Sequence, residues 1–404
     1  NHCGSFNKWM DRERLYEGEE GYSKGAYVSA DSPYRHYFHF NDEEEWPYNG
    51  TYDGWWGHDT LPKLNYEESE ELYQAVLAIG RKWVSPPYNI DGWRLDVAAD
   101  LGHSNGFNHK FWKDFRRAVK DANPNAVILA EHYGNAEGWL QGDEWDTVMN
   151  YDAFMEPVTW FLTGMEKHSD AYNENMLGNS DAFIMAMRYN MRCLHMSALT
   201  TAMNELSNHD HSRFLSRTNH QVGRVAELGP EAADCNLNPA VMREAVAIQM
   251  TWPGSPTVYY GDEVGLTGFT DPDNRRTFPW GREDWQMMDY HRAAIQIHRA
   301  YPVLKTGSLE YLWNDYQGLS YARFNRDEQI IVVINNQDQP RNVVIEAWRA
   351  GLSRNKDSVM ERLLLSDEKM FTREKAWITA KGGILDFVMP AYGVMILHHE
   401  REKF

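Results

Sequence analysis

The chain has 404 residues, of which 42% are hydrophobic and 25% are charged, as in an ordinary soluble globular protein large enough for two domains or more. Its formal net charge of −19 argues against nucleic acid or an anionic membrane as a partner, and no apolar run is long enough to span a bilayer. Three cysteines make no disulfide framework. Aromatic residues, at 13%, suit both a Trp-rich core and a carbohydrate cleft, in which flat rings stack on sugars.

The first part of the chain is irregular and is followed by two expected helices. Residues 4–65 are rich in Gly, Tyr, Trp, Asp and Asn and lack strong periodicity; they contain the tetrapeptide GWWG. In 67–83 apolar residues recur at spacings of three and four, which predicts a helix. In 107–122 three Phe and a Val recur every four positions until Asn123-Pro124, which should end a second helix.

The stretch DGWRLDVAAD predicts a strand that carries a site. Trp93, Leu95 and Val97 would lie on one face of the strand, and Arg94 and Asp96 would lie on the other. The guanidinium would keep the carboxylate ionised, as a nucleophile requires. A structural ion pair is an equal alternative from this strand alone, because structural pairs also perturb charges.

Two later segments favour the site. The apolar run 126–130 is typical of a parallel strand covered on both faces, and it ends on Glu131. A carboxylate in that position lies where α/β barrels keep their catalytic groups. Asp96 and Glu131 are 35 residues apart, room for one helix and one strand, so they should end adjacent strands. In NELSNHDHSRF, His209 and Asp210 are expected at a third strand end.

The order of these motifs resembles the α-amylase superfamily of glycoside hydrolases. The resemblance rests on DGWRLDVAA, ILAEH and SNHD, and the opening Asn1-His2 is similar to the tail of the family's first motif. LPKLN and YYGDEVGLTGFTDPDNRRTFPW resemble motifs of the branch that contains neopullulanase, cyclomaltodextrinase and amylopullulanase. The resemblance covers nearly the whole chain.

The resemblance implies a retaining glycoside hydrolase acting on α-1,4 bonds, with tolerance for α-1,6 bonds, in starch-type α-glucans, maltooligosaccharides, pullulan or cyclodextrins. It implies that Asp96 is the nucleophile, Glu131 the acid/base and Asp210 the carboxylate that stabilises the transition state. The substrate contacts that the motifs imply are His2, Arg94, His209, Asp271, Arg275 and Asn65, and GWWG adds Trp55 and Trp56, for which packing is the alternative. A non-catalytic sugar-binding homologue is the competing interpretation, but it would be expected to lose a carboxylate, and this chain keeps all three.

The implied fold is α/β, a partial (β/α)8 TIM barrel of about strands four to eight followed by a small antiparallel β-sandwich. The barrel domain would occupy residues 1–300, with 4–65 as the excursion after strand three, and the sandwich would occupy 301–404. Residues 149–154 would form the strand between the Glu131 and Asp210 motifs, and 257–261 would be strand eight.

Short β-branched runs separated by turns support the sandwich on their own. They occupy 318–324, 330–335, 343–345 and 394–398.

Strands one and two and most of strand three have no counterpart, so we expect an N-terminally incomplete barrel with unpaired strand edges. Such a fragment should aggregate or be inactive alone.

The chemistry requires no cofactor, and the expected partner is the α-glucan substrate. The histidines follow no HExxH or similar ligand spacing. By resemblance, Asn1 could bind a structural calcium ion. The sequence leaves the oligomeric state open. It has no signal peptide but also no initiator Met, so location is open too, with the cytoplasm favoured over secretion.

Overall fold

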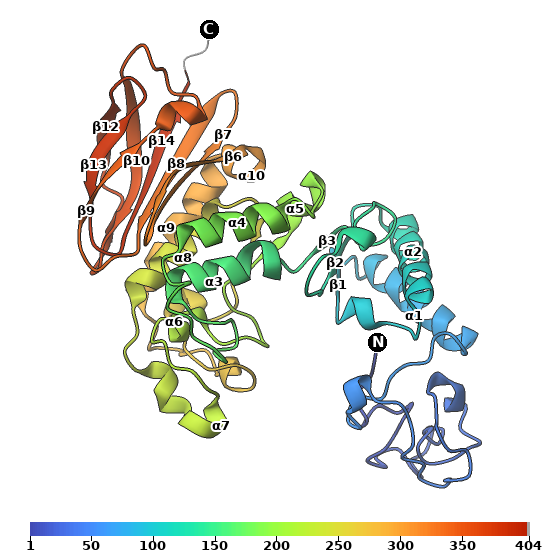
Figure 1. Cartoon of the computed structure of the whole chain (residues 1–404). Helices are drawn as coiled ribbons and strands as arrows, with labels where there is room; N and C mark the ends of the chain where they lie inside the picture. Colours follow the sequence, from blue (N-terminus) through green and yellow to red (C-terminus); the bar gives the residue numbers. More distant parts are fainter. Residues whose placement is uncertain (402–404) are drawn as a thin grey trace. The chain divides into compact units, whose positions relative to one another are not determined.

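The computed structural model describes residues 1–401, which form two compact units, one from Asn1 to Val148 and one from Met149 onward (Figure 1). Across the described residues, no helix has both the length and the apolar character that crossing a membrane requires.

The first unit contains a parallel sheet flanked by two helices. Its elements are α1 (Glu70–Val84), β1 (Gly92–Leu95), α2 (Asn105–Ala122), β2 (Val127–Ala130) and β3 (Thr147–Val148). The strand order is β1-β2-β3, and Leu95 pairs with Ala130. Asp96 and Glu131 therefore follow adjacent parallel strands, as predicted. Both expected helices are present, and α2 ends before Asn123, whose N–H bonds to the Val119 carbonyl.

Residues 4–65 are irregular, as expected, and are held by isolated backbone bridges. Phe40 pairs with Tyr52 and Gly54 with Pro62, both antiparallel. A third bridge joins His2 to Lys63, so the opening Asn-His lies directly beside the LPKLN motif. The irregular segment thus brings two sequence motifs together without a continuous strand.

Two predicted strands and one predicted strand end are wrong. The strand expected at 149–154 is absent, because the strand in this part of the chain is β3, which ends at Val148. Tyr151–Met155 forms a π-helical turn that leads into α3, because its aromatic and Met side chains are buried at helical spacing. The strand expected at 257–261 is β5 (Ser255–Pro256), because Gly261 has φ 92° and turns the chain. Asp210 lies six residues beyond β4 (Met203–Asn204), in a loop.

The second unit carries more helices and an antiparallel sheet. Its helices are α3 (Glu156–Thr163), α4 (Ser180–Met191), α5 (Met196–Thr201), α6 (Phe214–Arg217), α7 (Val225–Leu228), α8 (Pro239–Thr251), α9 (Trp285–Ala300) and α10 (Val303–Thr306). Its strands, after the parallel pair β4 and β5, are β6 (Ser308–Asp315), β7 (Gly318–Phe324), β8 (Glu328–Asn335), β9 (Arg341–Ile345), β10 (Ser358–Ser366), β11 (Phe371–Thr372), β12 (Ala376–Ala380), β13 (Leu385–Met389) and β14 (Gly393–Glu400).

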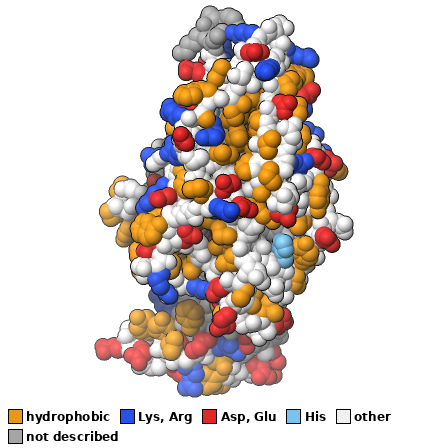
Figure 2. All heavy atoms as spheres, turned by 90° about the vertical axis from the view of Figure 1, so that its left-hand side faces the viewer, with side chains coloured by type: hydrophobic (Ala, Val, Ile, Leu, Met, Phe, Trp, Pro, Cys, Tyr) orange, Lys and Arg blue, Asp and Glu red, His pale blue; other side chains and the backbone are white. Residues whose placement is uncertain are grey.

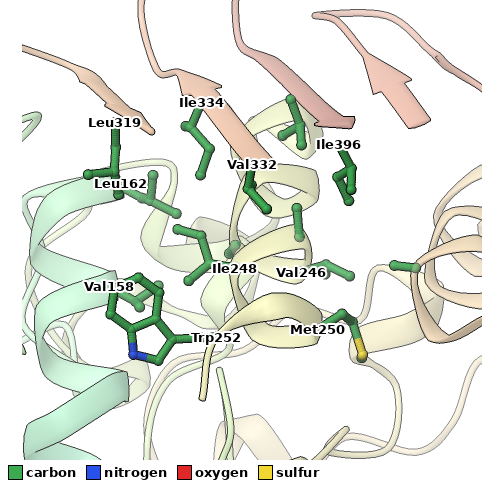
Figure 3. Packing of buried hydrophobic residues seen from close by; sticks show 14 of the residues in the cluster. Val158, Leu162, Val246, Ile248, Met250, Trp252, Leu319, Val332, Ile334 and Ile396 are labelled. Atoms are coloured by element: carbon green, nitrogen blue, oxygen red, sulfur yellow. The ribbon is translucent and has the colours of Figure 1, made fainter. Parts of the chain in front are cut away.

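The C-terminal sheet is buried on both faces, which explains its continuous β-branched runs. Its order is β11-β10-β14-β8-β7-β6, with β12 beside β10. Along β8, Val332 and Ile334 pack in one cluster with Val158 and Leu162 of α3, Ile248 of α8 and Trp252, which follows α8 (Figure 3). The alternate residues pack against the β9–β13 pair, as the side-chain period of two requires. The antiparallel C-terminal sheets are thus as predicted.

The compact units divide the chain near residue 148, whereas the sequence analysis placed a domain boundary at residue 300. Phe154 and Trp252, which precede residue 300, share one hydrophobic cluster with Val332 and Ile396, which follow it. The hydrophobic core of the second unit therefore continues across residue 300. The assignment of 301–404 to a separate domain stays a prediction. On the face seen in Figure 2, hydrophobic side chains gather in patches over the upper part of the molecule, with charged side chains around them.

Candidate active site

Arg94 joins the two carboxylates that follow β1 and β2. Its Nη1 donates to Asp96 Oδ1, and its Nη2 lies 3.1 Å from Glu131 Oε2. The Asp96 side chain is 57% exposed, whereas that of Glu131 is 5% exposed. One guanidinium therefore holds an accessible carboxylate next to a buried one.

The backbone between them is strained. Val97 has φ 37° and ψ 48°, a left-handed conformation that is costly for a β-branched residue. This conformation allows the Val97 N–H to donate to Glu131 Oε2 at 3.0 Å, and the Glu131 N–H donates to the Leu95 carbonyl at 2.9 Å. Strain of this kind is common where a site over-determines its geometry. Here it fixes Glu131 against the residue that follows Asp96.

The charges around Asp96 keep it ionised. Partial burial raises the pKa of Asp96, but the hydrogen bond and charge of Arg94 outweigh it, so the net pKa lies below its usual value. His2 contributes in the same direction, with its Nε2 at 3.9 Å from Asp96 Oδ2. An ionised, exposed carboxylate is suited to attack on an electrophilic carbon.

His2 is held in place by an aromatic contact. Its imidazole stacks on Trp55 with ring centroids 4.9 Å apart and 17° between the planes. The Trp55 indole N–H in turn donates to Asp100 Oδ2 at 2.9 Å. Trp55 therefore supports His2, and Asp100, which the sequence analysis did not single out, orients Trp55. The two acidic residues of the loop after β1 thus have different partners: Asp96 binds Arg94, and Asp100 binds Trp55.

Trp56 and Asn65 lie in contrasting environments. Trp56 is 81% exposed and has φ 50°, which projects a flat ring toward solvent beside Trp55. A groove lined by Trp56, Lys63 and the 99–105 loop adjoins it. Asn65 is 2% exposed, and its amide donates to Glu68 at 2.7 Å, which suits a residue that holds the loop. The substrate contacts assigned to both stay predictions.

The second unit gathers the remaining predicted residues into one cluster. Arg275 Nη2 lies 2.9 Å from Asp271 Oδ1 and 3.5 Å from Asp210 Oδ1, and His209 Nε2 lies 3.3 Å from Asp210 Oδ2. The side chains of all four are between 34% and 47% exposed. A half-exposed carboxylate flanked by Arg and His can accept hydrogen bonds from hydroxyl groups or face a developing cation.

Asn208, for which the sequence predicts no role, shapes the turn that presents Asp210. Its Oδ1 accepts the N–H groups of Asp210 at 2.9 Å and of His211 at 3.0 Å. Its amide donates to Glu205 at 2.7 Å and to the Tyr151 hydroxyl at 3.2 Å. An Asn that bonds the backbone two residues on is a recognised turn former, so the signal was present in the sequence.

One group within the described residues is compact enough to be tested as a cation site. Ligand atoms of Glu166, His168 and Asp170 all lie within 4.8 Å of one another. Glu166 already binds His168 at 2.9 Å, and Asp170 accepts two hydrogen bonds from Arg224 at 2.9 and 2.6 Å. A cation would have to displace these partners, so the group fits an ion-pair network better.

Asn1 does not offer its side-chain oxygen freely to calcium. In the orientation that satisfies both ends of its amide, the nitrogen donates to the Asp100 carbonyl at 2.9 Å and the oxygen accepts from Trp55 at 3.1 Å. Bound calcium is a prediction that this geometry does not favour at Asn1.

Comparison with known proteins identifies the family of the chain. A family model described as alpha amylase, catalytic domain, matches residues 1–341. An amylopullulanase from Thermoanaerobacterium saccharolyticum is 30% identical, over 91% of this chain and 28% of that protein. Neopullulanase 2 from Thermoactinomyces vulgaris is 29% identical, over 82% of this chain and 55% of that protein. The chain thus spans about half or less of these relatives.

A solved structure resembles the chain over almost its full length. A debranching enzyme from Nostoc punctiforme has a TM-score of 0.75 and 26% identity, covering 99% of this chain and 74% of that one.

Proposed function

Because the chain belongs to the alpha amylase catalytic-domain family, we propose that it is a retaining glycoside hydrolase that cleaves α-1,4-glucosidic bonds in starch-type α-glucans. The observation that carries the proposal is the single Arg94 guanidinium that contacts both Asp96 and Glu131, at the ends of adjacent parallel strands. Retaining enzymes hold their two carboxyl groups about 5–5.5 Å apart. Neighbouring strands lie about 4.8 Å apart, so this placement supplies such a pair.

In the proposed reaction, Asp96 attacks the anomeric carbon while Glu131 donates its proton to the glycosidic oxygen. The glycosidic bond breaks, the shortened chain leaves with a free hydroxyl, and a glycosyl ester forms on Asp96. Glu131, now a carboxylate, takes a proton from water, and the hydroxyl attacks the same carbon and releases Asp96. Two inversions leave an α-anomeric product. Asp210 would stabilise the positive charge that develops on the sugar.

The substrate range is the finer part of the proposal. Relatives named neopullulanase and amylopullulanase support pullulan, and with it tolerance for α-1,6 bonds, while a cyclomaltodextrinase from Bacillus, 30% identical, supports cyclodextrins. His2, Arg94, His209, Asp271 and Arg275 would contact sugar hydroxyl groups. Product analysis on starch, pullulan, cyclodextrin and maltooligosaccharides tests the range; activity confined to sucrose or trehalose would contradict it.

The fold of the proposed enzyme is part of an α/β barrel. The parallel groups β1-β2-β3 and β4-β5 support this assignment, since α/β barrels place their active residues after such strands. No metal takes part in the proposed chemistry, and any calcium would be structural.

The proposal is tested, in a complete barrel, by two isosteric substitutions and a matched control. Asp96→Asn and Glu131→Gln should each lower kcat at least about 10³-fold without changing the melting temperature, because each removes a group that changes its bonding in the transition state. Asp121→Asn, at an exposed position of α2, should leave kcat unchanged. More than a few per cent of wild-type turnover in either active-site variant would refute its role.

Stereochemistry gives an independent test. An NMR time course with maltotriose should show the α-anomer of the product before mutarotation. An initial β-anomer would exclude the double displacement.

A further inference from the structure

Asn274, in the loop after β5, is a fully buried residue with no predicted role. Its side chain is 0% exposed, and its amide nitrogen donates to the Asn208 carbonyl at 2.9 Å and to the His211 carbonyl at 2.7 Å. These two carbonyls flank His209 and Asp210. One buried amide therefore spans the turn that carries Asp210.

The same loop binds the two carbonyls in between. Arg275 Nε donates to the His209 carbonyl at 2.8 Å, and the Thr270 hydroxyl donates to the Asp210 carbonyl. Four consecutive carbonyls, from Asn208 to His211, thus each accept a hydrogen bond from a side chain of residues 270–275. A row of bonds this regular fixes the direction of the turn as well as its position.

The loop itself is anchored so that it can hold the turn. Arg213, which is fully buried, donates from Nε to the Asn274 carbonyl at 2.9 Å. Gly268, with φ 156°, lies so close to this segment that a Cβ atom would be 2.8 Å from Asn274 Cα and 2.6 Å from the Asp273 carbonyl oxygen. Only glycine allows that approach, and the approach places the Asn274 amide beneath the turn.

We propose that Asn274 is a positioning residue that fixes Asp210 relative to the sugar-contacting pair Asp271 and Arg275. The inference rests on the proposed function, since it assigns Asn274 to the same reaction. Loss of its amide removes one hydrogen bond from each of two carbonyls, those of Asn208 and His211, and lets the turn relax. A displacement of about 1 Å in a reacting group costs on the order of 10²-fold in rate.

A purely structural role would give a different pattern from a positioning role. If Asn274 only stabilised the fold, its removal would lower the melting temperature and leave the kcat of the folded fraction intact. If it acts through Asp210, its removal must lower kcat, and that loss must disappear where Asp210 no longer functions. Asn336 provides the matched control, because it is also buried and its amide donates to a backbone carbonyl, that of Leu162, at 3.0 Å.

The experiment is a double-mutant cycle in the full-length protein, with maltotriose as substrate. Asn274→Ala should lower kcat about 10- to 100-fold with KM changed less than about 3-fold, since the contact matters mainly in the transition state. In an Asp210→Asn background the same change should alter residual kcat less than about 3-fold. Asn336→Ala should lower the melting temperature and keep wild-type kcat.

Equal losses of kcat in both backgrounds, or an unchanged kcat in Asn274→Ala, would overturn the inference. So would an Asn336→Ala variant that loses kcat to the same extent. If Asn274→Ala does not fold, Thr270→Val replaces it, because it removes the hydroxyl bonded to Asp210 and keeps the side-chain shape. Full activity of Asp210→Asn would instead refute the proposed function of that residue.

Hydrogen exchange gives a readout that needs no turnover. In Asn274→Ala, amides of residues 207–213 should exchange at least about 10-fold faster, while those of 318–335 in β7 and β8 stay unchanged. The same rates in the wild type and the variant would show that the amide does not hold the turn.

Discussion

Replacing Arg94 by Gln removes the positive charge that lies between Asp96 and Glu131. A hydrogen bond to a charged group contributes roughly 1.5–3 kcal/mol. Because the Asp96 side chain is 57% exposed, solvent screening reduces this contribution to about 1–1.5 kcal/mol. Partial burial already raises the pKa of Asp96 and Arg94 opposes it, so Arg94→Gln should raise this pKa.

The assay is kcat/KM for a maltooligosaccharide between pH 3 and pH 8. The acidic limb, which reports the ionisation of the nucleophile in the free enzyme, should move to higher pH in Arg94→Gln. Arg292→Gln, which breaks an exposed ion pair with Asp289 in α9, is the control and should leave the limb in place. Return of samples to pH 6 separates ionisation from acid unfolding. An acidic limb that does not move would refute the account of how Asp96 is kept ionised.

Three further substitutions test the second unit. Burial would raise the pKa of Glu166, but the hydrogen bond and charge of His168 outweigh it and lower this pKa to about 2. This stabilisation, roughly 3 kcal/mol at most, is fully present above about pH 4.5 and is lost as pH falls toward about 2. Urea unfolding of Glu166→Gln should therefore show a deficit at pH 7 that shrinks progressively below about pH 4.5. Burial raises the pKa of Glu244, which costs stability as pH rises above about 4.5, so Glu244→Gln should exceed the wild type in melting temperature at pH 8 and match it near pH 5. Trp252→Ala, in a fully buried position, should cost about 3–5 kcal/mol in the free energy of unfolding, and a loss below about 1 kcal/mol would contradict the packing in Figure 3.

The parts of the fold that could be predicted are those with long or repeated patterns. Helix α2 was predicted because its aromatic residues recur every four positions, and β8 because a β-branched run between turns has few other outcomes. The strand expected at 149–154 failed because Tyr151, Phe154 and Met155 have a spacing that also suits a helical turn. Short apolar segments do not distinguish these states, and packing decides between them.

The residues of the candidate site also differ in how far the sequence predicts them. Asp96, Glu131 and Asp210 were predicted because their chemistry is in their side chains and their motifs. Asn274 was not, because its role depends on where the carbonyl groups of residues 208 and 211 point, and that direction is set by folding. Residues that act on backbone atoms have no sequence pattern of their own beyond a turn or a glycine.

The two aspartates are held by different physical means, and this difference has a consequence. Asp96 is oriented by the charge of Arg94, an interaction that weakens when the carboxylate is protonated. Asp210 lies in a turn whose backbone carbonyls accept hydrogen bonds from the neutral side chains of Thr270 and Asn274 and from the guanidinium of Arg275. None of these bonds requires the carboxylate of Asp210 to be ionised. Defects at Arg94 should therefore grow as pH falls, whereas defects at Asn274 should be the same at every pH at which the protein is folded. Pairing Arg94→Gln and Asn274→Ala across one pH series would separate the two, and a parallel pH dependence in both variants would show that a single mechanism holds both carboxylates.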